Sequence, residues 1–312
     1  MQAVLITDYV HQILPETLKQ KGFQVQYDTC MDNDKLYHVI DQYTGIVINS
    51  KILMDQKMLD KAVNLKWIAR LGSGMEIIDL KICHEREIFV CNAPEGNSHA
   101  VAEHELGMLL ALSNHLIRAD GQVREFNWQR EQNRGSELRG KTLGIIGLGH
   151  TGCAFAEKCI GLGMEIIGYD KYRVDYPASM NHVERVSLKE LKDRSEIISF
   201  HIPLTPETHF MVDRAFIASC RDNVIISNTS RGNIIRTIDL VEALYSGKVK
   251  GSCLDVFENE KPESYNDEEK EMYHKLYQLE QVVLSPHVAG WTHESLELIA
   301  LTILKKIEKN MN

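Results

Sequence analysis

A glycine-rich turn, placed between an apolar run and a helical pattern, constrains this chain most. Residues 143–146 form the apolar run, and the G-x-G-x-x-G sequence of 147–152 follows at once. The next expected strand, 164–169, is followed by Asp170, 18 residues beyond Gly152. In such a strand–turn–helix unit the first glycine permits the turn, the second lets a pyrophosphate approach the main chain, and the third allows close helix–strand packing. The sequence therefore predicts a dinucleotide site.

Asp170 indicates which dinucleotide is bound. The N-terminus of the helix after the turn offers amide donors and a positive dipole end to the phosphates. A carboxylate at the end of the second strand accepts hydrogen bonds from the adenosine ribose and repels a 2′-phosphate. This favours NAD over NADP, and the cations Lys171 and Arg173 weaken that preference slightly. The alternative, an ordinary glycine-rich turn with a solvated Asp, does not account for the strand–helix–strand context.

The rest of the chain alternates between strand-like and helix-like patterns, which predicts an α/β fold with parallel sheets covered by helices on both faces. The 312 residues suggest about two domains. A long helix is expected from Ser98, as N-cap, to about Arg118, and a last helix from Thr292, as N-cap, to about Lys309. The acidic and tyrosine-rich segment 258–280 breaks the alternation and is expected to be a solvated excursion. The expected strands are 3–7, 23–27, 45–48, 67–71, 143–146, 164–169, 197–201, 224–228, 252–256 and 282–284.

Composition excludes several classes of protein. The chain has 35 basic and 44 acidic residues, a net charge of −9, so the basic footprint of a nucleic-acid binder is lacking. No apolar run approaches the ~18 residues of a membrane helix, and Asp8 interrupts an N-terminus that has no cationic region, so no signal peptide is expected. Seven Cys without C-x-x-C spacing favour reduced thiols and a cytoplasmic location. No metal site is expected.

Polar residues follow three of the later strands, where the carboxyl ends of a doubly wound sheet share one edge. Arg231, Glu260 and His287 are expected to converge there. His287 would take the hydroxyl proton of a 2-hydroxy acid while hydride leaves C2, and return it in reduction. An ionised Glu260 would fix its orientation, and Arg231 would grip the substrate carboxylate with two parallel N–H groups. Taken singly, each is more often an ordinary surface or loop residue.

Seven segments, spread over nearly the whole chain, resemble the D-isomer-specific 2-hydroxyacid dehydrogenases, and most closely the D-3-phosphoglycerate dehydrogenases. They are RLGSGMEIID at 70–79, VAEH at 101–104, GKTLGIIGLG at 140–149, HIPLT at 201–205 with Thr208, NTSRG at 228–232, LDVFENE at 254–260 and SPHVAGWT at 285–292. The formate dehydrogenase branch is disfavoured, because it carries Gln where Glu260 stands.

The resemblance implies two doubly wound domains. A flavodoxin-like substrate domain, 1–97 plus 288–312, would contain an inserted Rossmann NAD domain, 98–287, and a homodimer would form through the 98–118 helix region. Arg231, Glu260 and His287 would be catalytic, and the main-chain amides of Gly72, Ser73 and Gly74 would bind the substrate carboxylate. The residues expected to bind NAD are Gly147, Gly149, His150, Thr151, Gly152, Asp170, His201, Pro203, Thr208, Thr229, Asp255 (to the nicotinamide carboxamide) and Gly290.

One departure concerns the substrate. Phosphoglycerate dehydrogenases commonly place Arg-Ser after the third strand to hold the substrate phosphate, whereas this chain has Asn49, Ser50 and Lys51. These three residues are the expected substrate contacts, although a solvated loop lysine explains Lys51 equally well. The chain also ends where longer relatives carry a regulatory domain, so serine feedback through such a domain is not expected.

The expected function is hydride transfer between NAD and a small anionic D-2-hydroxy or 2-keto acid. The first choice of substrate is 3-phosphoglycerate/phosphohydroxypyruvate, as in serine biosynthesis. The alternative within this class is a glyoxylate, hydroxypyruvate or other 2-keto acid reductase. The alternative from another class is an NAD(H)-sensing, corepressor-like interaction protein, since such proteins can keep the catalytic triplet.

Overall fold

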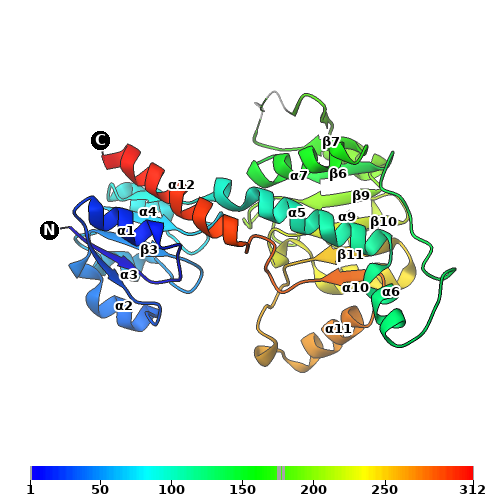
Figure 1. Cartoon of the computed structure of the whole chain (residues 1–312), viewed down its shortest axis with the longest axis horizontal. Helices are drawn as coiled ribbons and strands as arrows, with labels where there is room; N and C mark the ends of the chain where they lie inside the picture. Colours follow the sequence, from blue (N-terminus) through cyan, green and yellow to red (C-terminus); the bar gives the residue numbers. More distant parts are fainter. Residues whose placement is uncertain (1, 174–176, 178–179, 312) are drawn as a thin grey trace. The chain divides into compact units, whose positions relative to one another are not determined.

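The computed structural model describes residues 2–173, 177 and 180–311, and the chain divides into two compact units (Figure 1). One unit comprises Met1–Asn97 with Trp291–Asn312, and the other Ser98–Gly290. Each unit has one sheet, and all strand pairings in the described residues are parallel. The expected class, α/β with two doubly wound parallel sheets, is confirmed.

The sheet of the first unit has the order β2-β1-β3-β4-β5, which is the flavodoxin-like order. Buried apolar side chains on its two faces form two cores, one with α2, α3 and α4 and the other with α1 and α12. The strands are β1 (Ala3–Ile6), β2 (Gln24–Tyr27), β3 (Gly45–Ile48), β4 (Trp67–Arg70) and β5 (Phe89–Cys91), and the helices are α1 (Ile13–Gln20), α2 (Asn33–Val39), α3 (Gln56–Lys61), α4 (Leu80–Glu85) and α12 (His293–Met311).

Local sequence explains where these helices begin. Asp32, Asp55 and Asp79 precede α2, α3 and α4, and each side chain accepts a hydrogen bond from a main-chain N–H of the first turn. The expectation for Thr292 is confirmed, because its Oγ1 accepts from Ser295 N at 3.0 Å where α12 starts. Helix α12 then packs on α1 of the same unit.

The sheet of the second unit has the order β12-β11-β10-β9-β6-β7-β8. The strands are added on one side of β6 and then on the other, so the order of the strands along the chain switches between β6 and β9. Helices α5 and α7 cover one face, and α8 to α11 cover the other. The strands are β6 (Thr142–Ile146), β7 (Glu165–Tyr169), β8 (Glu184–Arg185), β9 (Ile197–Phe200), β10 (Val224–Asn228), β11 (Val249–Leu254) and β12 (Val282–Leu284), and the helices are α5 (Pro94–Ser113), α6 (Leu116–Arg124), α7 (His150–Gly161), α8 (Leu188–Arg194), α9 (Arg214–Ala218), α10 (Thr237–Ser246) and α11 (Asp267–Tyr277).

The long helix expected from Ser98 differs in both of its ends. Helix α5 begins at Pro94, and Ser98 is a buried residue inside it rather than its N-cap. Proline suits a first helical turn, because the main-chain N–H that it lacks would have no partner there. The helix ends at Ser113, and His115, with φ +52° in the left-handed region, separates it from α6.

The segment 258–280 is largely exposed, as expected, but it also contains regular structure. It contains a 3-10 turn, Pro262–Ser264, and the helix α11. Asn266 and Glu269 form a reciprocal capping box at the start of α11. The acidic first turn faces solvent, but Tyr273 and Leu276 are buried against the core of the unit.

Candidate active site

The glycine turn joins β6 to α7, and its three glycines occupy different environments. Gly147 has φ +92°, and a Cβ there would lie 2.4 Å from the carbonyl oxygen of His201. A Cβ at Gly152 would lie 2.0 Å from the carbonyl oxygen of Gly147. A Cβ at Gly149, the N-cap of α7, would meet nothing within 4 Å. The two tight glycines therefore close the turn, and the open one leaves space at the helix N-terminus, which fits the pyrophosphate of a dinucleotide.

Asp170 is attached to this turn from the end of β7. Its Oδ2 accepts from Leu148 N at 2.9 Å, and its Oδ1 accepts from the main-chain N–H groups of Tyr172 and Arg173. The Arg173 guanidinium donates to Leu148 O at 2.8 Å, and Lys171 pairs with Glu207. The carboxylate is thus fixed beside the turn, where an adenosine ribose would bind.

His201, at the end of β9, lies next to the same turn. Its N–H donates to Ile146 O at 2.8 Å, and its ring Nε2 lies 2.8 Å from Ser199 Oγ. The side chain is 1% exposed, and burial lowers the pKa of His201, with Glu105 opposing part of the shift. The ring is therefore neutral, and its buried Nδ1 has no hydrogen-bond partner among the described residues. Farther along the same loop, Thr208 Oγ1 donates to Pro203 O at 2.7 Å.

A buried carboxylate from α5, not anticipated from the sequence, joins the ends of β9 and β10. Glu105 is fully buried and accepts from the hydroxyls of Ser199, Ser227 and Thr229. Thr229 Oγ1, expected at the cofactor, donates to Glu105 Oε2 at 2.8 Å. The sequence signal was an acidic residue inside the apolar pattern of a helix.

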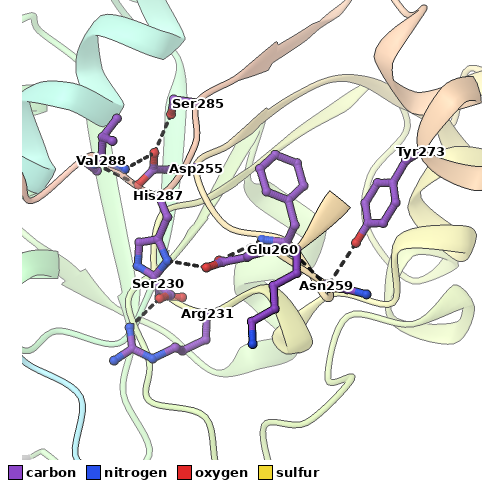
Figure 2. A network of polar contacts seen from close by, with 12 residues as sticks. Ser230, Arg231, Asp255, Asn259, Glu260, Tyr273, Ser285, His287 and Val288 are labelled. Atoms are coloured by element: carbon purple, nitrogen blue, oxygen red, sulfur yellow. Dashed lines mark hydrogen bonds and ion pairs between the residues drawn. The ribbon is translucent and has the colours of Figure 1, made fainter. Parts of the chain in front are cut away.

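His287 and Glu260 lie in direct contact at the carboxyl edge of the second sheet (Figure 2). His287 Nδ1 is 2.8 Å from Glu260 Oε2, and Phe257 N donates to Glu260 Oε1 at 3.3 Å. Partial burial raises the pKa of Glu260, but the hydrogen bond and charge of His287 outweigh it and hold the pKa below its ordinary value. An ionised carboxylate only accepts hydrogen bonds, so Nδ1 carries a proton, and in the neutral ring Nε2 is left as an acceptor.

Arg231 follows β10 on a loop that contacts the Glu260 loop. Asn228 closes this loop by donating from Nδ2 to Arg231 O at 2.9 Å and accepting from Ser230 N at 3.0 Å. A Cβ at Gly232 would lie 1.8 Å from Phe257 O, so only glycine permits this approach. The Arg231 guanidinium donates to Ser230 O at 2.7 Å (Figure 2). The structure therefore brings the loops of all three expected catalytic residues together.

Asp255 holds the loop that carries His287. Its buried carboxylate accepts from Ser285 Oγ, from Val288 N and from Ala289 N, and its carbonyl accepts from His287 N at 2.7 Å (Figure 2). His287 adopts φ +57°, a left-handed conformation that a non-glycine residue keeps only when its surroundings impose it. The Asp255 contacts supply that constraint, and the expected contact with nicotinamide stays a prediction. Gly290 is the last residue of the second unit.

The expected substrate contacts other than Arg231 lie in the first unit, in two loops. After β4, Gly72 has φ +109° and accepts at its carbonyl from Ala93 N, while Ser73 O accepts from Asn92 Nδ2. Carboxylate binding by the main-chain amides of Gly72, Ser73 and Gly74 stays a prediction.

The loop after β3 lies beside Asp8, a carboxylate that the sequence reasoning missed. Asp8 Oδ2 accepts from Asn49 N at 3.0 Å, and Asp8 Oδ1 is 3.8 Å from Lys51 Nζ. Lys51 Nζ also donates to Thr29 O at 2.6 Å. The exposed Ser50 lies between Asn49 and Lys51. The cation expected at a substrate phosphate therefore already has an anionic neighbour.

A doubly wound sheet with a glycine turn at its switch point, and a His–Glu pair on the same edge, defines the class of dinucleotide-dependent dehydrogenases. The family model "D-isomer specific 2-hydroxyacid dehydrogenase, NAD binding domain" matches residues 106–289. The chain belongs to this family and carries its NAD-binding domain, so the resemblance seen in the sequence is confirmed.

Individual relatives differ in length and in the activity that their names give. The chain is 34% identical to a D-3-phosphoglycerate dehydrogenase of Archaeoglobus fulgidus over 97% of its own length, but it spans only 56% of that relative. It is 37% identical to a hydroxypyruvate reductase of Thermotoga maritima, over 90% of this chain and 89% of the relative. A D-lactate dehydrogenase from Aquifex aeolicus, solved with NAD and lactic acid, is 28% identical with a TM-score of 0.86, over 99% of this chain and 95% of that one.

Two features are absent from the described residues. In the described residues, no group of three or more His, Cys, Asp or Glu side chains is arranged to hold a metal ion. Among the helices of the same residues, none is long and apolar enough to cross a membrane.

Proposed function

We propose that this chain is an NAD-dependent oxidoreductase that interconverts a small D-2-hydroxy acid and its 2-keto acid. The observation that carries the proposal is the 2.8 Å contact between His287 Nδ1 and Glu260 Oε2, on the sheet edge that also holds Arg231 and the glycine turn. Bound NAD supplies the hydride acceptor or donor. Asp170 and the open space at Gly149 favour NAD as the cofactor that this unit holds.

The chain's own residues divide the remaining work. His287 keeps a proton on Nδ1 toward Glu260, so its Nε2 takes the hydroxyl proton of the hydroxy acid and returns it when the keto acid is reduced. Glu260, whose pKa is held below the ordinary value, stays ionised near neutral pH and stabilises the imidazolium formed in between. Arg231 binds the substrate carboxylate with two N–H groups, a geometry that lysine does not offer.

The substrate has two candidates within this reaction. Phosphohydroxypyruvate is supported by the D-3-phosphoglycerate dehydrogenase relatives at about 34% identity. An unphosphorylated keto acid such as hydroxypyruvate or glyoxylate is favoured by a specific observation, since Lys51 is paired with Asp8 and with Thr29 O. A phosphate dianion beside Asp8 would be repelled, and like charges in contact cost several kcal/mol. The hydroxypyruvate reductase relative, which this chain spans almost fully, points the same way.

The test is NADH oxidation with phosphohydroxypyruvate, hydroxypyruvate, glyoxylate, pyruvate and 2-ketoglutarate. We expect turnover, with a higher kcat/KM for an unphosphorylated acid, and we expect His287→Ala to lower kcat by about 10²–10⁴-fold while NADH binding is kept. NADH binding without turnover of any keto acid would overturn the proposal that the chain is an enzyme, and would favour an NAD(H)-sensing interaction protein. A preference for NADPH would overturn the role of Asp170.

A second variant separates the substrate candidates. Lys51→Ala should lower kcat/KM for phosphohydroxypyruvate and leave hydroxypyruvate unaffected if Lys51 binds a phosphate. An equal effect on both substrates refutes a phosphate contact at this residue.

We also propose a cytoplasmic homodimer that forms through the 98–118 helix region. All seven cysteines are free thiols, which supports a reducing compartment. Exposed apolar side chains at Leu116 and Ile117, where α6 begins, support a protein contact there.

A further inference from the structure

Two tyrosines of the 258–280 segment hold the main chain of Asn259, the residue before Glu260. Asn259 N donates to Tyr273 Oη at 3.0 Å, and Tyr265 Oη donates to Asn259 O at 3.1 Å. Figure 2 shows the Tyr273 hydroxyl directed at Asn259, with Glu260 and His287 on the other side of this loop. The main-chain N–H and C=O of Asn259 are thus both held by the hydroxyls of this tyrosine pair.

The tyrosine pair is itself rigid. The rings of Tyr265 and Tyr273 stack with centroids 4.6 Å apart and planes 20° apart, and Phe257 packs edge-on against Tyr273 at 6.2 Å. Tyr273 is 1% exposed, and burial raises the pKa of Tyr273 to about 12, so its hydroxyl stays neutral. The packing therefore holds the two tyrosine hydroxyls in place for their hydrogen bonds to Asn259.

The side chain of Asn259 is held by the same segment. Its Nδ2 donates to Ser264 Oγ at 3.0 Å and to Glu269 Oε1 at 3.2 Å, and its Oδ1 accepts from Lys261 N at 3.0 Å. Every polar group of Asn259 thus has a partner between residues 261 and 273.

Glu260 is the residue that benefits from this arrangement. Its side chain is 39% exposed, and a long side chain at such a site loses rotamer entropy when it is held in one conformation. We propose that Tyr265 and Tyr273 are positioning residues, which fix the main chain of Asn259 and thereby direct the Glu260 carboxylate at His287 Nδ1. The proposal rests on the proposed function only for its kinetic consequence, because the contact exists without turnover.

Tyr273→Phe is the decisive variant, since it keeps the stacked ring and removes the acceptor of Asn259 N. We expect kcat for keto acid reduction to fall about tenfold, because small misplacements of catalytic groups have large effects. KM for the keto acid and the Kd of NADH should stay within about twofold. In a Glu260→Ala background, Tyr273→Phe should change kcat by less than about twofold, because the residue that it positions is absent.

A spectroscopic measurement tests the same contact without turnover. With ¹⁵N-labelled histidine, the ring signals of His287, assigned with His287→Gln, report which nitrogen carries the proton in the neutral ring. The wild type should show the Nδ1–H form. Tyr273→Phe and Glu260→Ala should both move the population toward Nε2–H. This result stands even if the wild type reduces none of the keto acids.

Tyr277→Phe is the matched control. Its ring stacks on Tyr273 at 5.6 Å and its hydroxyl lies 3.4 Å from Tyr265 Oη, whereas both tyrosine bonds to Asn259 come from residues 265 and 273. We expect kcat within about twofold of the wild type. If Tyr273→Phe does not fold by circular dichroism, Tyr265→Phe, which removes the donor to Asn259 O, replaces it.

Three results would overturn the positioning role. They are an unchanged His287 tautomer in the folded Tyr273→Phe or Tyr265→Phe variant, an equal loss of kcat with and without Glu260, and an equal loss in Tyr277→Phe. An inactive wild type that still loses the Nδ1–H form in Tyr273→Phe would overturn the proposed function and leave the positioning role intact.

Discussion

The buried polar network around Glu105 shows how single residues stabilise the edge of the second sheet. A buried carboxylate is costly unless its oxygens are hydrogen-bonded, and Glu105 meets this condition with three hydroxyls. His201 lies beside it, 3.6 Å from the carboxylate to the ring Nε2. Because burial lowers the pKa of His201, the folded protein keeps the ring neutral at pH values where an exposed histidine takes up a proton.

This difference predicts how stability depends on pH. The unfolded chain protonates His201 as the pH falls through about 6.5, while the folded chain does so only at lower pH. Between these values the unfolded state binds more protons, so the free energy of unfolding falls as the pH drops below about 6.5. The contribution of this residue is at most about 1.4 kcal/mol per pH unit.

Urea unfolding at several pH values between 8 and 5 measures this contribution. The wild type should lose stability below about pH 6.5 more steeply than His201→Gln, whose side chain does not titrate. Because both proteins share all other titrating groups, the difference in slope belongs to His201. Equal slopes would show that His201 does not carry a lowered pKa.

The site residues that could be predicted from the sequence lie in motifs at strand ends, whereas those that were missed depend on tertiary packing. His287 and Glu260 were placed by motif spacing and by the rule that parallel strands share a carboxyl edge, and the structure brings these two side chains together. Glu105 and Asp8 were missed, because the environment of a carboxylate depends on which helix face or strand end meets it in three dimensions. A linear pattern does not contain that information.

At the scale of elements, the β6–turn–α7 unit separates two uses of glycine. Gly152 is required for packing, because a Cβ would lie 2.0 Å from the main-chain oxygen of Gly147. Gly149 has open space around its missing Cβ, so folding alone does not require glycine there. Its absence of a side chain matters only when a ligand approaches the helix N-terminus.

A pair of alanine variants tests this distinction. Gly149→Ala should change stability by less than about 1 kcal/mol and weaken NADH binding about tenfold or more, since a methyl group would occupy the space for the pyrophosphate. Gly152→Ala should lower the free energy of unfolding by about 1–3 kcal/mol through overpacking. Thermal unfolding and NADH titration by fluorescence separate the two effects. If Gly149→Ala binds NADH as tightly as the wild type, the cofactor does not approach this turn.

The two helical elements that differ from expectation do so for local reasons. Helix α11 was hidden because its first turn is acidic and only Tyr273 and Leu276, three residues apart, are buried. The division between α5 and α6 was not predicted, because the break occurs at His115, which takes a left-handed conformation without a glycine or proline to signal it in the sequence. Strand β8 has only two residues, Glu184 and Arg185, too few to produce an alternating pattern.

At the scale of the whole molecule, the chain order and the spatial units do not coincide. The C-terminal helix α12 packs with α1 in the first unit, although nearly 200 residues of the second unit separate them in sequence. We propose that the first unit binds the substrate and that the second binds NAD. The net charge of −9 gives an anionic substrate no general attraction, so local groups such as Arg231 must provide it.

The second unit also exposes an apolar surface that follows α5. We define the 116–128 surface by Leu116, Ile117, Val123, Phe126 and Trp128, all of which are exposed. Phe126 is 99% exposed and Trp128 is 75% exposed. Aromatic side chains are enriched in the cores of protein–protein interfaces, and their exposure to water is unfavourable. This surface therefore favours contact with a second copy of the chain.

Light scattering after size-exclusion chromatography tests the homodimer. The wild type should give twice the 35.6 kDa mass of one chain, and the double variant Ile117→Glu/Phe126→Glu should give a single chain mass, because two charges on each copy would be buried. Tyr9→Glu changes an exposed aromatic residue of the first unit, 70% exposed, and should leave the dimer intact. A wild type of single-chain mass excludes the dimer. A double variant that stays dimeric places its interface outside the 116–128 surface.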